Sequence, residues 1–257
     1  MGTMQRGKIR NAVLFSALST LFSSLLFRSV LILIICVVTA IFSGKFIITV
    51  FPVLWCILFS KYLIFEILVV SHVIETNLGI MDWYNYVDDD LYLGAIPIDS
   101  MDHKSVLALD LRVEAVLSIL EDFEFNCSTL GGRPIQPDEW KREDMEHTQL
   151  NSKDFYPPSF QILEEGADWI NSHLIKGKRV YCHCKSGIGR SASVVLAYYM
   201  KYKRMSALAA YEDLKSHRPM IFHQKSRQMI NILAYETYRN QKVKENVTQS
   251  DNSNNRS

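Results

Sequence analysis

The fold of this chain is decided by the segment Val180-Tyr181-Cys182-His183-Cys184-Lys185-Ser186-Gly187-Ile188-Gly189-Arg190-Ser191. The segment predicts a short apolar strand, a loop with two glycines, and a helix that continues through Met200. A loop before a helix N-terminus directs several backbone N–H groups to one point, at the positive end of the helix dipole. Gly187 and Gly189 let this backbone turn and leave room for a ligand. The pattern therefore predicts an anion-binding site.

The centre of this loop carries residues suited to nucleophilic attack on phosphorus. A free thiol has a pKa of about 8.5, and a helix N-terminus with nearby cations lowers that value to ~3.5–7.5. The field that binds a phosphate dianion therefore also favours the thiolate of Cys184. Arg190 provides a planar fork for two phosphoryl oxygens. Ser191 can donate its hydroxyl to the sulfur and stabilise it as a leaving group, and we expect His183 to orient the loop rather than to transfer protons.

Two other uses of these cysteines compete with catalysis. A cysteine followed six residues later by an arginine is common by chance, and a buried cysteine is usually a small hydrophobic residue. A metal site would need Cys182, His183 and Cys184 to converge, but alternation along a strand places His183 on the opposite side from the two cysteines. The chain also has no Cys-x-x-Cys pair. We therefore expect no metal and no cofactor.

Residues 183–191 match the pattern H-C-x-x-G-x-x-R-S, which is the signature of the cysteine-dependent protein tyrosine and dual-specificity phosphatases. The chain resembles that family over residues 83–238. That resemblance implies an α/β fold of the phosphotyrosine protein phosphatase type, with a central, mostly parallel sheet flanked by helices. It also implies hydrolysis of a phosphate monoester through a phosphocysteine intermediate on Cys184. The expected phosphate-binding residues are those of the loop, namely Lys185, Ser186, Gly187, Ile188, Gly189 and Arg190.

A phosphatase of this kind also needs a general acid, because an alkoxide is a poor leaving group. The same carboxylate can then activate the water that releases phosphate. Asp154 is the best candidate, since it lies in a loop after a predicted strand, 30 residues before Cys184. The family carries its acid on such a loop at about that separation. Asp168, Glu164 and Glu165 are weaker candidates, because a helix is predicted around them and they would form its solvated face.

Within the family, the chain is most similar to the mitochondrial-type lipid phosphatases that dephosphorylate phosphatidylglycerophosphate. This similarity implies a phospholipid headgroup as substrate, and the alternative is a dual-specificity or tyrosine protein phosphatase acting on phosphoproteins. A non-catalytic phosphate-binding adaptor is disfavoured by the intact Cys184, Arg190 and Asp154. Ile188 and Gly189 depart from the lipid branch, which usually carries a basic residue and a serine there. The matching residues are Trp83-Tyr84, Val87-Asp88, Leu93-Gly94-Ala95-Ile96-Pro97, Glu121-Asp122-Phe123-Glu124, Glu139-Trp140-Lys141, Cys184-Lys185 and Arg218-Pro219.

Length and composition limit the kinds of partner. The chain has 257 residues, which allows one catalytic domain and an appendage. Its formal net charge is +1, so it lacks the domain-wide basic excess of a nucleic-acid-binding protein. Its five cysteines form no disulfide framework, which indicates a reducing compartment. The expected partners are a phosphorylated lipid or phosphoprotein and a membrane, not a nucleic acid, and the sequence sets no oligomeric state.

The N-terminal part of the chain predicts a membrane region over residues 1–74. One membrane-spanning helix needs ~20 apolar residues. We expect a hairpin of two spans near residues 25–43 and 46–66, with three spans or a buried soluble helical domain as alternatives. The charged side chains between residues 12 and 73 are only Arg28, Lys45, Lys61 and Glu66.

The charges at the N-terminus predict the orientation in the membrane. Arg6, Lys8 and Arg10 precede the apolar stretch and place the N-terminus on the cytoplasmic or an equivalent side. Two spans return the catalytic domain to that reducing side. A basic start without acidic residues is also typical of an organellar transit peptide, which makes a mitochondrial membrane the alternative location.

The remainder of the chain predicts a catalytic domain over residues 81–240 and a disordered polar tail over 241–257. Strands interleaved with helices favour an α/β architecture with a mostly parallel sheet. Ser159 and Ser206 are expected to cap helices. The further predicted elements are strands at 91–95, 115–119 and 146–150 and helices at 103–111, 159–174, 206–217 and 224–238.

Overall fold

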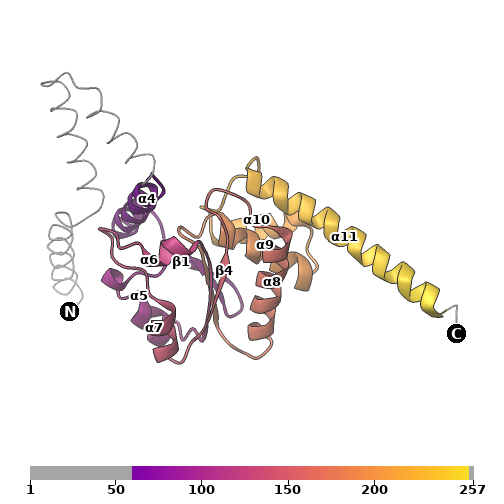
Figure 1. Cartoon of the computed structure of the whole chain (residues 1–257), viewed down its shortest axis with the longest axis horizontal. Coiled ribbons are helices and arrows are strands. Elements are labelled where there is room, and N and C mark those ends of the chain that lie inside the picture. The colour runs from indigo at the N-terminus through magenta and orange to yellow at the C-terminus, as the bar shows by residue number, and fades with distance from the viewer. Residues whose placement is uncertain (1–59, 255–257) are drawn as a thin grey trace, which may run out of the picture. The chain divides into compact units, whose positions relative to one another are not determined.

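The computed structural model describes residues 60–254 (Figure 1). The described residues form two compact units, the first with residues 60–81, 97–104 and 123–136, and the second with residues 82–96, 105–122 and 137–254. Within this part of the chain, no helix has both the length and the apolar composition that crossing a bilayer requires. The span expected near residues 25–43, and most of the one near 46–66, lie outside the described residues.

The second unit is built on five strands, β1 Tyr84–Asp88, β2 Leu91–Gly94, β3 Ala115–Leu120, β4 Glu146–Asn151 and β5 Val180–His183. Their order in the sheet is β1-β2-β5-β3-β4. Four strands run parallel, and β1 pairs antiparallel with β2 at one edge. This confirms the mostly parallel sheet. The edge strand β1 was not predicted, because its sequence Tyr-Asn-Tyr-Val-Asp is short and half polar.

Helices cover both faces of this sheet (Figure 1). On one face lie α8 Phe160–Leu174, α9 Arg190–Tyr202 and α10 Ala207–His217, and on the other lies the short α7 Pro137–Arg142. The predicted caps of α8 and α10 are confirmed. The Ser159 hydroxyl accepts the N–H of Ile162, and the Ser206 hydroxyl accepts the N–H of Ala209, each at 3.3 Å.

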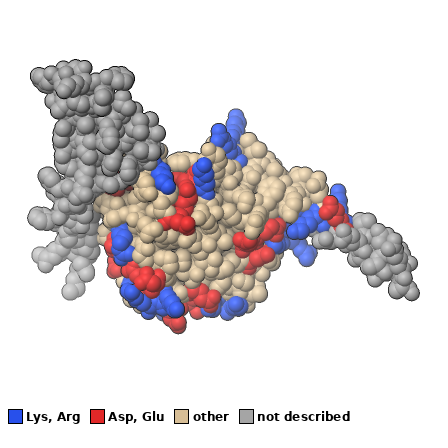
Figure 2. All heavy atoms as spheres, in the orientation of Figure 1, with Lys and Arg blue, Asp and Glu red and all other residues tan. Residues whose placement is uncertain are grey.

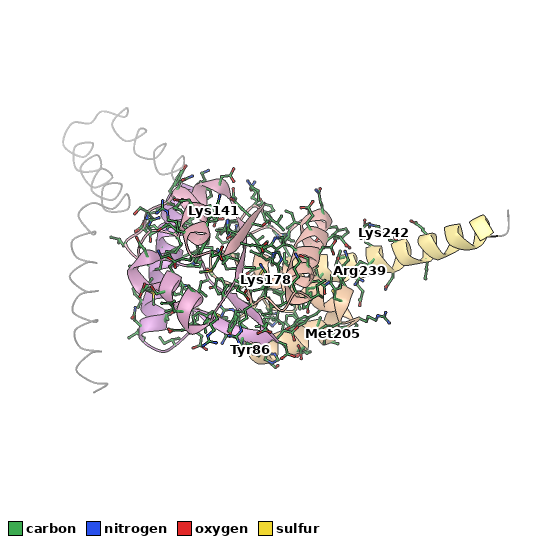
Figure 3. All side chains as sticks on the ribbon, turned by 90° about the horizontal axis from the view of Figure 1, so that it is seen from below. Tyr86, Lys141, Lys178, Met205, Arg239 and Lys242 are labelled. Atoms are coloured by element: carbon green, nitrogen blue, oxygen red, sulfur yellow. The ribbon has the colours of Figure 1, made fainter. Side chains whose placement is uncertain are left out.

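The core of the second unit lies between the sheet and α9. All six residues of β3 are buried, and so is every residue of α9 from Arg190 to Met200. Met205, which follows α9 and is labelled in Figure 3, packs against the same core. A helix enclosed on all sides has little freedom to shift. The loop that enters α9 is therefore fixed at its helical end.

Two predicted helices differ from the observed ones. The helix expected over 103–111 is a short α5, His103–Ser105, followed by the π-helix η2, Val106–Asp110. The last helix, α11, spans Arg227–Asn254, so the expectation of disorder from residue 241 is wrong for 241–254. That segment has no glycine or proline, and its Gln, Lys and Glu residues favour a helix.

The first unit has packing of its own around α4, Ser60–Asn77. The ring of Phe65 lies edge-on to Phe123 with 6.0 Å between ring centroids. The buried Glu66 accepts the backbone N–H of Leu130 on Oε1 at 2.6 Å. The unit also contains the 3-10 helix η1, Asp99–Met101, and most of α6, Asp122–Asn126. The first residues of α4, 60–66, are the end of the second expected membrane span.

Charges of both signs are interspersed on the face shown in Figure 2. Several form ion pairs within the second unit. Lys201 pairs with Glu164 and Asp168, and Arg142 lies 2.8 Å from Asp138 one helical turn away. An exposed pair such as Arg142 with Asp138 contributes little stability. On the described residues of this face, no large patch of a single sign stands out as a binding surface.

Candidate active site

Cys184 lies at the centre of the carboxyl edge of the sheet. Strand β5 pairs with β2 on one side and β3 on the other, and all three run parallel, so they end at the same edge. β5 ends at His183 and α9 begins at Arg190. Residues 184–190, here called the cysteine loop, therefore connect the central strand to the buried helix. This edge is the usual place for a ligand in a parallel sheet.

The carbonyl groups of the cysteine loop point away from its centre, because each one accepts a hydrogen bond from outside. In a trans peptide unit, the N–H of the following residue points opposite to the carbonyl. The N–H groups of residues 186–190 therefore face the centre of the loop and form an anion-binding concavity. The backbone donors are the N–H of Ile96 to Lys185 O at 3.0 Å, of Phe222 to Ile188 O at 3.1 Å, and of Ser193 to Gly189 O at 2.9 Å.

Arg218 holds two further carbonyls of the cysteine loop, those of Ser186 and Gly187. Its guanidinium is fully buried and donates to Gly187 O at 2.9 Å and to Ser186 O at 3.1 Å. A third donation, at 2.6 Å, goes to Asn85 Oδ1 on β1. Arg218 is therefore a positioning residue for the anion site. The sequence marked it only through the Arg218-Pro219 match to the family and gave no role for its side chain.

The structure requires glycine at only one of the two glycine positions of the loop. Gly187 has a φ of +67°, and a Cβ there would lie 2.4 Å from the carbonyl oxygen of Gly94. Both the backbone and the space therefore require glycine. Gly189 has a φ of −110°, and a Cβ there would meet only the Gln228 side chain, at 3.4 Å. The expected need for glycine is confirmed at 187 only.

The Cys184 thiol is 3% exposed and is surrounded by groups that favour its ionised form. Burial by itself raises the pKa of the thiol. Arg190, together with hydrogen bonds from Ser191 and from the N–H of Ser186, lowers it more, and the net shift of the Cys184 pKa is downward. The neighbouring Cys182 has no such groups, and burial raises its pKa well above the usual value. One sulfur of the two is thus prepared as a nucleophile.

Ser191 supplies a hydroxyl directly beside the sulfur. The residue is fully buried. As a hydrogen-bond donor to the sulfur, its hydroxyl lowers the pKa of the Cys184 thiol. A hydroxyl in this place stabilises negative charge on the sulfur by donating a hydrogen bond to it.

Asp154 lies over the cysteine loop between two cations. Its carboxylate pairs with the ammonium of Lys185, and its Oδ1 is 3.0 Å from Arg190 Nη2. The Asp154 N–H donates to Glu121 Oε1 at 3.0 Å, so a carboxylate just after β3 anchors the Asp154 loop. Arg190 also donates to the carbonyl of Ser152 at 2.9 Å. The structure thus brings Asp154 to the nucleophile, and it adds Glu121, for which the sequence had suggested no role.

The other acidic candidates do not reach the site. Asp168 accepts the Tyr202 hydroxyl at 2.7 Å and pairs with Lys201 on the surface of α8 and α9. Glu164 pairs with the same lysine, and Glu165 accepts a hydrogen bond from Gln161 within α8. Their placement on a partly solvated helix face agrees with the weaker prediction made for them.

His183 is buried and supports the loop through a chain of hydrogen bonds. Its Nδ1 lies 3.1 Å from the carbonyl oxygen of Cys184, which can only accept, so Nδ1 carries the proton. Burial lowers the pKa of His183 to about 3, and its Nε2 is therefore an acceptor for the Ser118 hydroxyl at 2.7 Å. The Ser118 Oγ in turn accepts from His147 Nε2 at 2.9 Å. Ser118 and His147 were not singled out from the sequence.

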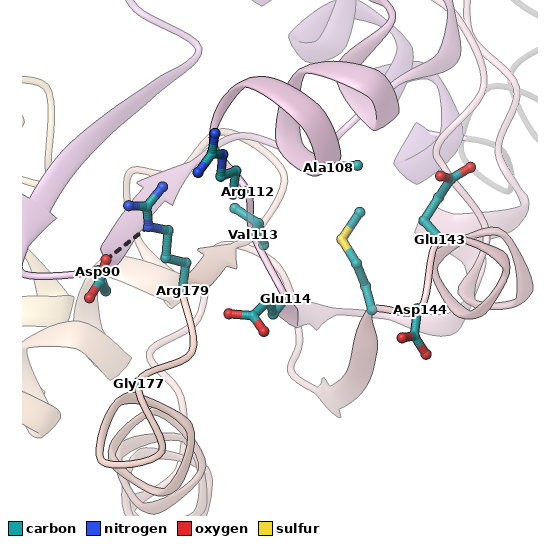
Figure 4. A pocket seen from close by; sticks show the side chains of 10 residues that line it. Asp90, Ala108, Arg112, Val113, Glu114, Glu143, Asp144, Gly177 and Arg179 are labelled. Carbon is teal, nitrogen blue, oxygen red and sulfur yellow. Dashed lines mark hydrogen bonds and ion pairs between the residues drawn. The ribbon is translucent and has the colours of Figure 1, made fainter.

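A separate cavity of about 510 Å³ lies at the amino edge of the sheet (Figure 4). Its lining includes residues just before β3, β4 and β5, such as Glu114, Met145 and Arg179. The Arg179 Nε donates to Asp90 Oδ1 at 2.9 Å. No cysteine, serine or histidine lines this cavity. The nucleophile and its cations thus all lie at the opposite, carboxyl edge of the sheet.

Among residues 60–254, no group of three or more His, Cys, Asp or Glu side chains is arranged to hold a metal ion. Within the cysteine loop, the neighbours of Cys184 are backbone N–H groups, a guanidinium and a hydroxyl, all of which are donors. A donor set of this kind binds anions and repels cations. The described site is therefore suited to a phosphate group.

Comparison with known proteins relates this site to a family. Residues 104–238 match the family model described as "Dual specificity phosphatase, catalytic domain". The Arabidopsis thaliana phosphatidylglycerophosphate phosphatase PTPMT2 is 31% identical over 151 residues, which cover 58% of this chain and 61% of that protein. The mouse (Mus musculus) phosphatidylglycerophosphatase and protein-tyrosine phosphatase 1 is 32% identical over 142 residues, 53% of this chain and 69% of that one. This chain thus spans less than two thirds of the Arabidopsis protein.

Solved structures show the same relation. The crystal structure of PTPMT1 in complex with PI(5)P aligns with a TM-score of 0.55 and 26% sequence identity, covering 63% of this chain and 99% of that one. The active form of Tk-PTP aligns with a TM-score of 0.51 and 25% identity over 61% of this chain and 97% of that one. Both alignments cover nearly the whole of the solved chains and fit within the length of the described residues.

Proposed function

The chain belongs to the dual specificity phosphatase family, and on that basis we propose that it is a membrane-anchored, cysteine-dependent phosphatase whose substrate is a phospholipid headgroup such as phosphatidylglycerophosphate. The observation that carries the proposal is the buried Cys184, whose pKa is lowered by Arg190 and by inward N–H groups. Residues 185–190 bind the phosphate. The catalytic residues are Cys184, Arg190, Asp154 and Ser191, with His183 in a supporting role.

In the first step, the Cys184 thiolate attacks phosphorus and the bond between phosphorus and the ester oxygen breaks. Arg190 and the N–H groups of residues 186–190 hold the three equatorial oxygens, where the charge of the transition state is spread. A bound phosphate dianion replaces the Asp154 carboxylate as the partner of Arg190. Protonated Asp154 then gives its proton to the leaving alkoxide.

In the second step, water attacks the phosphocysteine. Asp154, now ionised, accepts a proton from the water, the bond between phosphorus and sulfur breaks, and inorganic phosphate leaves. The electron pair of that bond returns to the sulfur, and the Ser191 hydroxyl stabilises the thiolate as it forms. The enzyme regains its starting state, so the residues of this chain complete the cycle without a cofactor.

Several observations support a lipid as the substrate. The Arabidopsis relative is named a phosphatidylglycerophosphate phosphatase, and the solved PTPMT1 structure is a complex with PI(5)P. The apolar residues between 12 and 59 contain only Arg28 and Lys45 as charged side chains, which favours attachment to a bilayer. A membrane anchor would keep the catalytic domain, residues 81–240, close to a phosphate at the lipid surface. The location we propose is the reducing side of a membrane, with a mitochondrial membrane as one candidate.

A protein substrate is the second candidate. The mouse relative is also named a protein-tyrosine phosphatase, and human dual specificity protein phosphatase 18 is 32% identical over 117 residues. Ile188 also stands in the loop where lipid-directed members usually carry a basic residue. One cation fewer at the rim of the site weakens binding of a doubly phosphorylated or strongly anionic headgroup, and it matters less for a phosphotyrosine.

A side-by-side assay decides between these substrates. The full chain is reconstituted in lipid vesicles and supplied with phosphatidylglycerophosphate, a phosphoinositide or a phosphotyrosine peptide, and the released phosphate is measured. We expect the highest kcat/KM on phosphatidylglycerophosphate and no turnover of any substrate by Cys184→Ser. A phosphopeptide preference would replace the lipid by a protein substrate. Turnover by Cys184→Ser would remove the cysteine mechanism itself.

A further inference from the structure

Two large aromatic side chains follow Asp154 and are left exposed. Phe155 is 60% exposed and Tyr156 is 50% exposed, although aromatic residues usually bury most of their area. Each ring has a lysine over it. The Lys185 Nζ lies 4.7 Å from the centre of the Phe155 ring, and the Lys153 Nζ lies 4.8 Å from that of Tyr156. We call Lys153, Phe155 and Tyr156 the aromatic rim.

The backbone holds the aromatic rim outward. Phe155 has a φ of +61°, in the left-handed region that a bulky side chain rarely adopts. The segment is anchored on both sides, because the Asp154 N–H donates to Glu121 and the Pro158 carbonyl accepts from Asn231 Nδ2 at 2.9 Å. An unfavourable backbone conformation fixed by anchors at both ends is typical of a functional segment. The exposure of the rings is therefore built into the loop.

The aromatic rim lies at the edge of the catalytic site. Lys185 contacts both the Asp154 carboxylate and the Phe155 ring, so one side chain joins the cysteine loop to the rim. Beyond the rim, residues 157–163 carry no charged side chain. A surface that approaches Cys184 closely on this side thus meets two aromatic rings and the ammonium of Lys153.

Rings of this kind beside a lysine fit the headgroup region of an anionic bilayer. Tyrosine and other aromatic side chains favour the membrane interface, where one part of the ring is in apolar and the other in polar surroundings. A lysine at the surface adds attraction to anionic lipids. The phosphate of a membrane lipid lies in that same region, so the nucleophile can reach it only if the surrounding rim enters it too.

Resting on the proposed lipid substrate, we propose that Lys153, Phe155 and Tyr156 form a docking rim that enters the headgroup region of an anionic bilayer and brings Cys184 to lipid-borne phosphate. The rim then makes the enzyme discriminate between a phosphate ester in a bilayer and a phosphate ester in solution. It increases turnover of a phosphate ester embedded in a bilayer and leaves turnover of a soluble ester unchanged.

The first test compares two substrates with the full chain in phosphatidylcholine vesicles that contain phosphatidylglycerol. One is phosphatidylglycerophosphate in the vesicle, and the other is soluble p-nitrophenyl phosphate. Tyr156→Ser should lower kcat/KM for the vesicle substrate about tenfold, the order expected for partial burial of one aromatic side chain, and leave the soluble substrate unchanged. Tyr86→Ser is the matched control, because Tyr86 is also 50% exposed but lies on edge strand β1 (Figure 3).

The second test detects contact with the bilayer without using turnover. Tyr156→Trp and Tyr86→Trp are compared in vesicles with and without brominated lipids. The quantity measured is the tryptophan fluorescence of each variant minus that of the unchanged protein. The added fluorescence should be quenched in Tyr156→Trp and not in Tyr86→Trp. Absence of quenching at position 156 overturns the docking rim, even if the lipid is hydrolysed. Equal loss of turnover on both substrates in Tyr156→Ser also overturns it.

These two tests separate the rim from the proposed substrate. Quenching at position 156 without hydrolysis of any vesicle lipid would leave the rim in place and contradict the lipid substrate. Selective loss of phosphopeptide turnover in Tyr156→Ser, with no quenching by brominated lipid, would assign the rim to a protein partner and overturn the proposal.

Discussion

Replacing Arg218 with glutamine tests how the cysteine loop keeps its N–H groups turned inward. The buried guanidinium donates to Gly187 O at 2.9 Å, to Ser186 O at 3.1 Å and to Asn85 Oδ1 at 2.6 Å. A hydrogen bond that involves a charged group contributes about 1.5–3 kcal/mol. Glutamine can replace only one of these donations. We therefore expect the free energy of unfolding to fall by about 3–5 kcal/mol.

The same substitution also acts on the nucleophile. Without their donor, the carbonyls of Ser186 and Gly187 can rotate, and each rotation turns an N–H away from the centre of the loop. The guanidinium charge is lost as well. Burial lowers the pKa of Arg218, while Tyr181 and Cys184 raise it, so Arg218 and the thiolate attract each other. We expect the Cys184 pKa to rise, because the substitution removes a nearby positive charge and lets inward N–H groups that favour the thiolate turn away.

The assay is the pH dependence of Cys184 alkylation by iodoacetamide, read by mass spectrometry, together with the Tm. Arg179→Gln is the control, because the Arg179 guanidinium also donates to a side chain and a carbonyl, Asp90 Oδ1 at 2.9 Å and Leu111 O at 3.0 Å. It is 40% exposed and lies at the opposite edge of the sheet. This control should lower the Tm and leave the alkylation midpoint unchanged. If Arg218→Gln lowers the Tm without moving the midpoint, Arg218 supports only the fold and the reasoning fails.

Three further predictions concern the acid, the hydrogen-bond chain and pH. Asp154→Ala should lower turnover of alkyl phosphates about 10²–10⁴-fold and that of an activated aryl phosphate far less, and equal losses would exclude Asp154 as the acid. Ser118→Ala should raise the lower pKa of the pH–rate profile, with rescue by Ser118→Thr, and an unchanged profile would remove Ser118 from the site. Burial lowers the pKa of His183 to about 3 from 6.5, so the unfolded chain binds a proton between these values that the folded chain does not. The free energy of unfolding should therefore fall as the pH drops below 6.5, by about 3 kcal/mol at pH 4. In His183→Asn, the Tm should fall less steeply with decreasing pH than in the unchanged protein. Equal slopes of Tm against pH in the two proteins would contradict this.

Local features of the sequence were sufficient for much of this account. The caps at Ser159 and Ser206 and the passage from β5 to α9 depend on residues within a few positions of one another. Such patterns are readable because hydrogen bonding at a helix N-terminus is a local interaction. The same holds for Gly187, whose positive φ follows from the turn after a buried strand.

The residues that support the site were not readable, because their partners are far apart in the sequence. Arg218 is 31 residues from Gly187, Glu121 is 33 from Asp154, and Ser118 is 65 from His183. Each meets its partner only once the sheet order brings strand ends together. A buried arginine or serine has no local signature that separates it from an exposed one, whereas the nucleophile has the loop around it.

The misread elements lie at the edges of the second unit. Strand β1 pairs on one side only, so its sequence lacks the apolar run that marks a buried strand. The end of α11 is polar, and polar composition predicts disorder there, although the same residues favour a helix. In both places composition alone does not decide the structure.

The central claim is that the Cys184 sulfur becomes covalently bonded to phosphorus during turnover. The most direct measurement is rapid acid quenching of Asp154→Asn with a labelled aryl phosphate, followed by peptide mapping. The account predicts labelled phosphate on the peptide that contains Cys184, because the good leaving group needs no acid while the second step lacks its base. Label on another residue, or full turnover with no labelled peptide at any quench time, would contradict it.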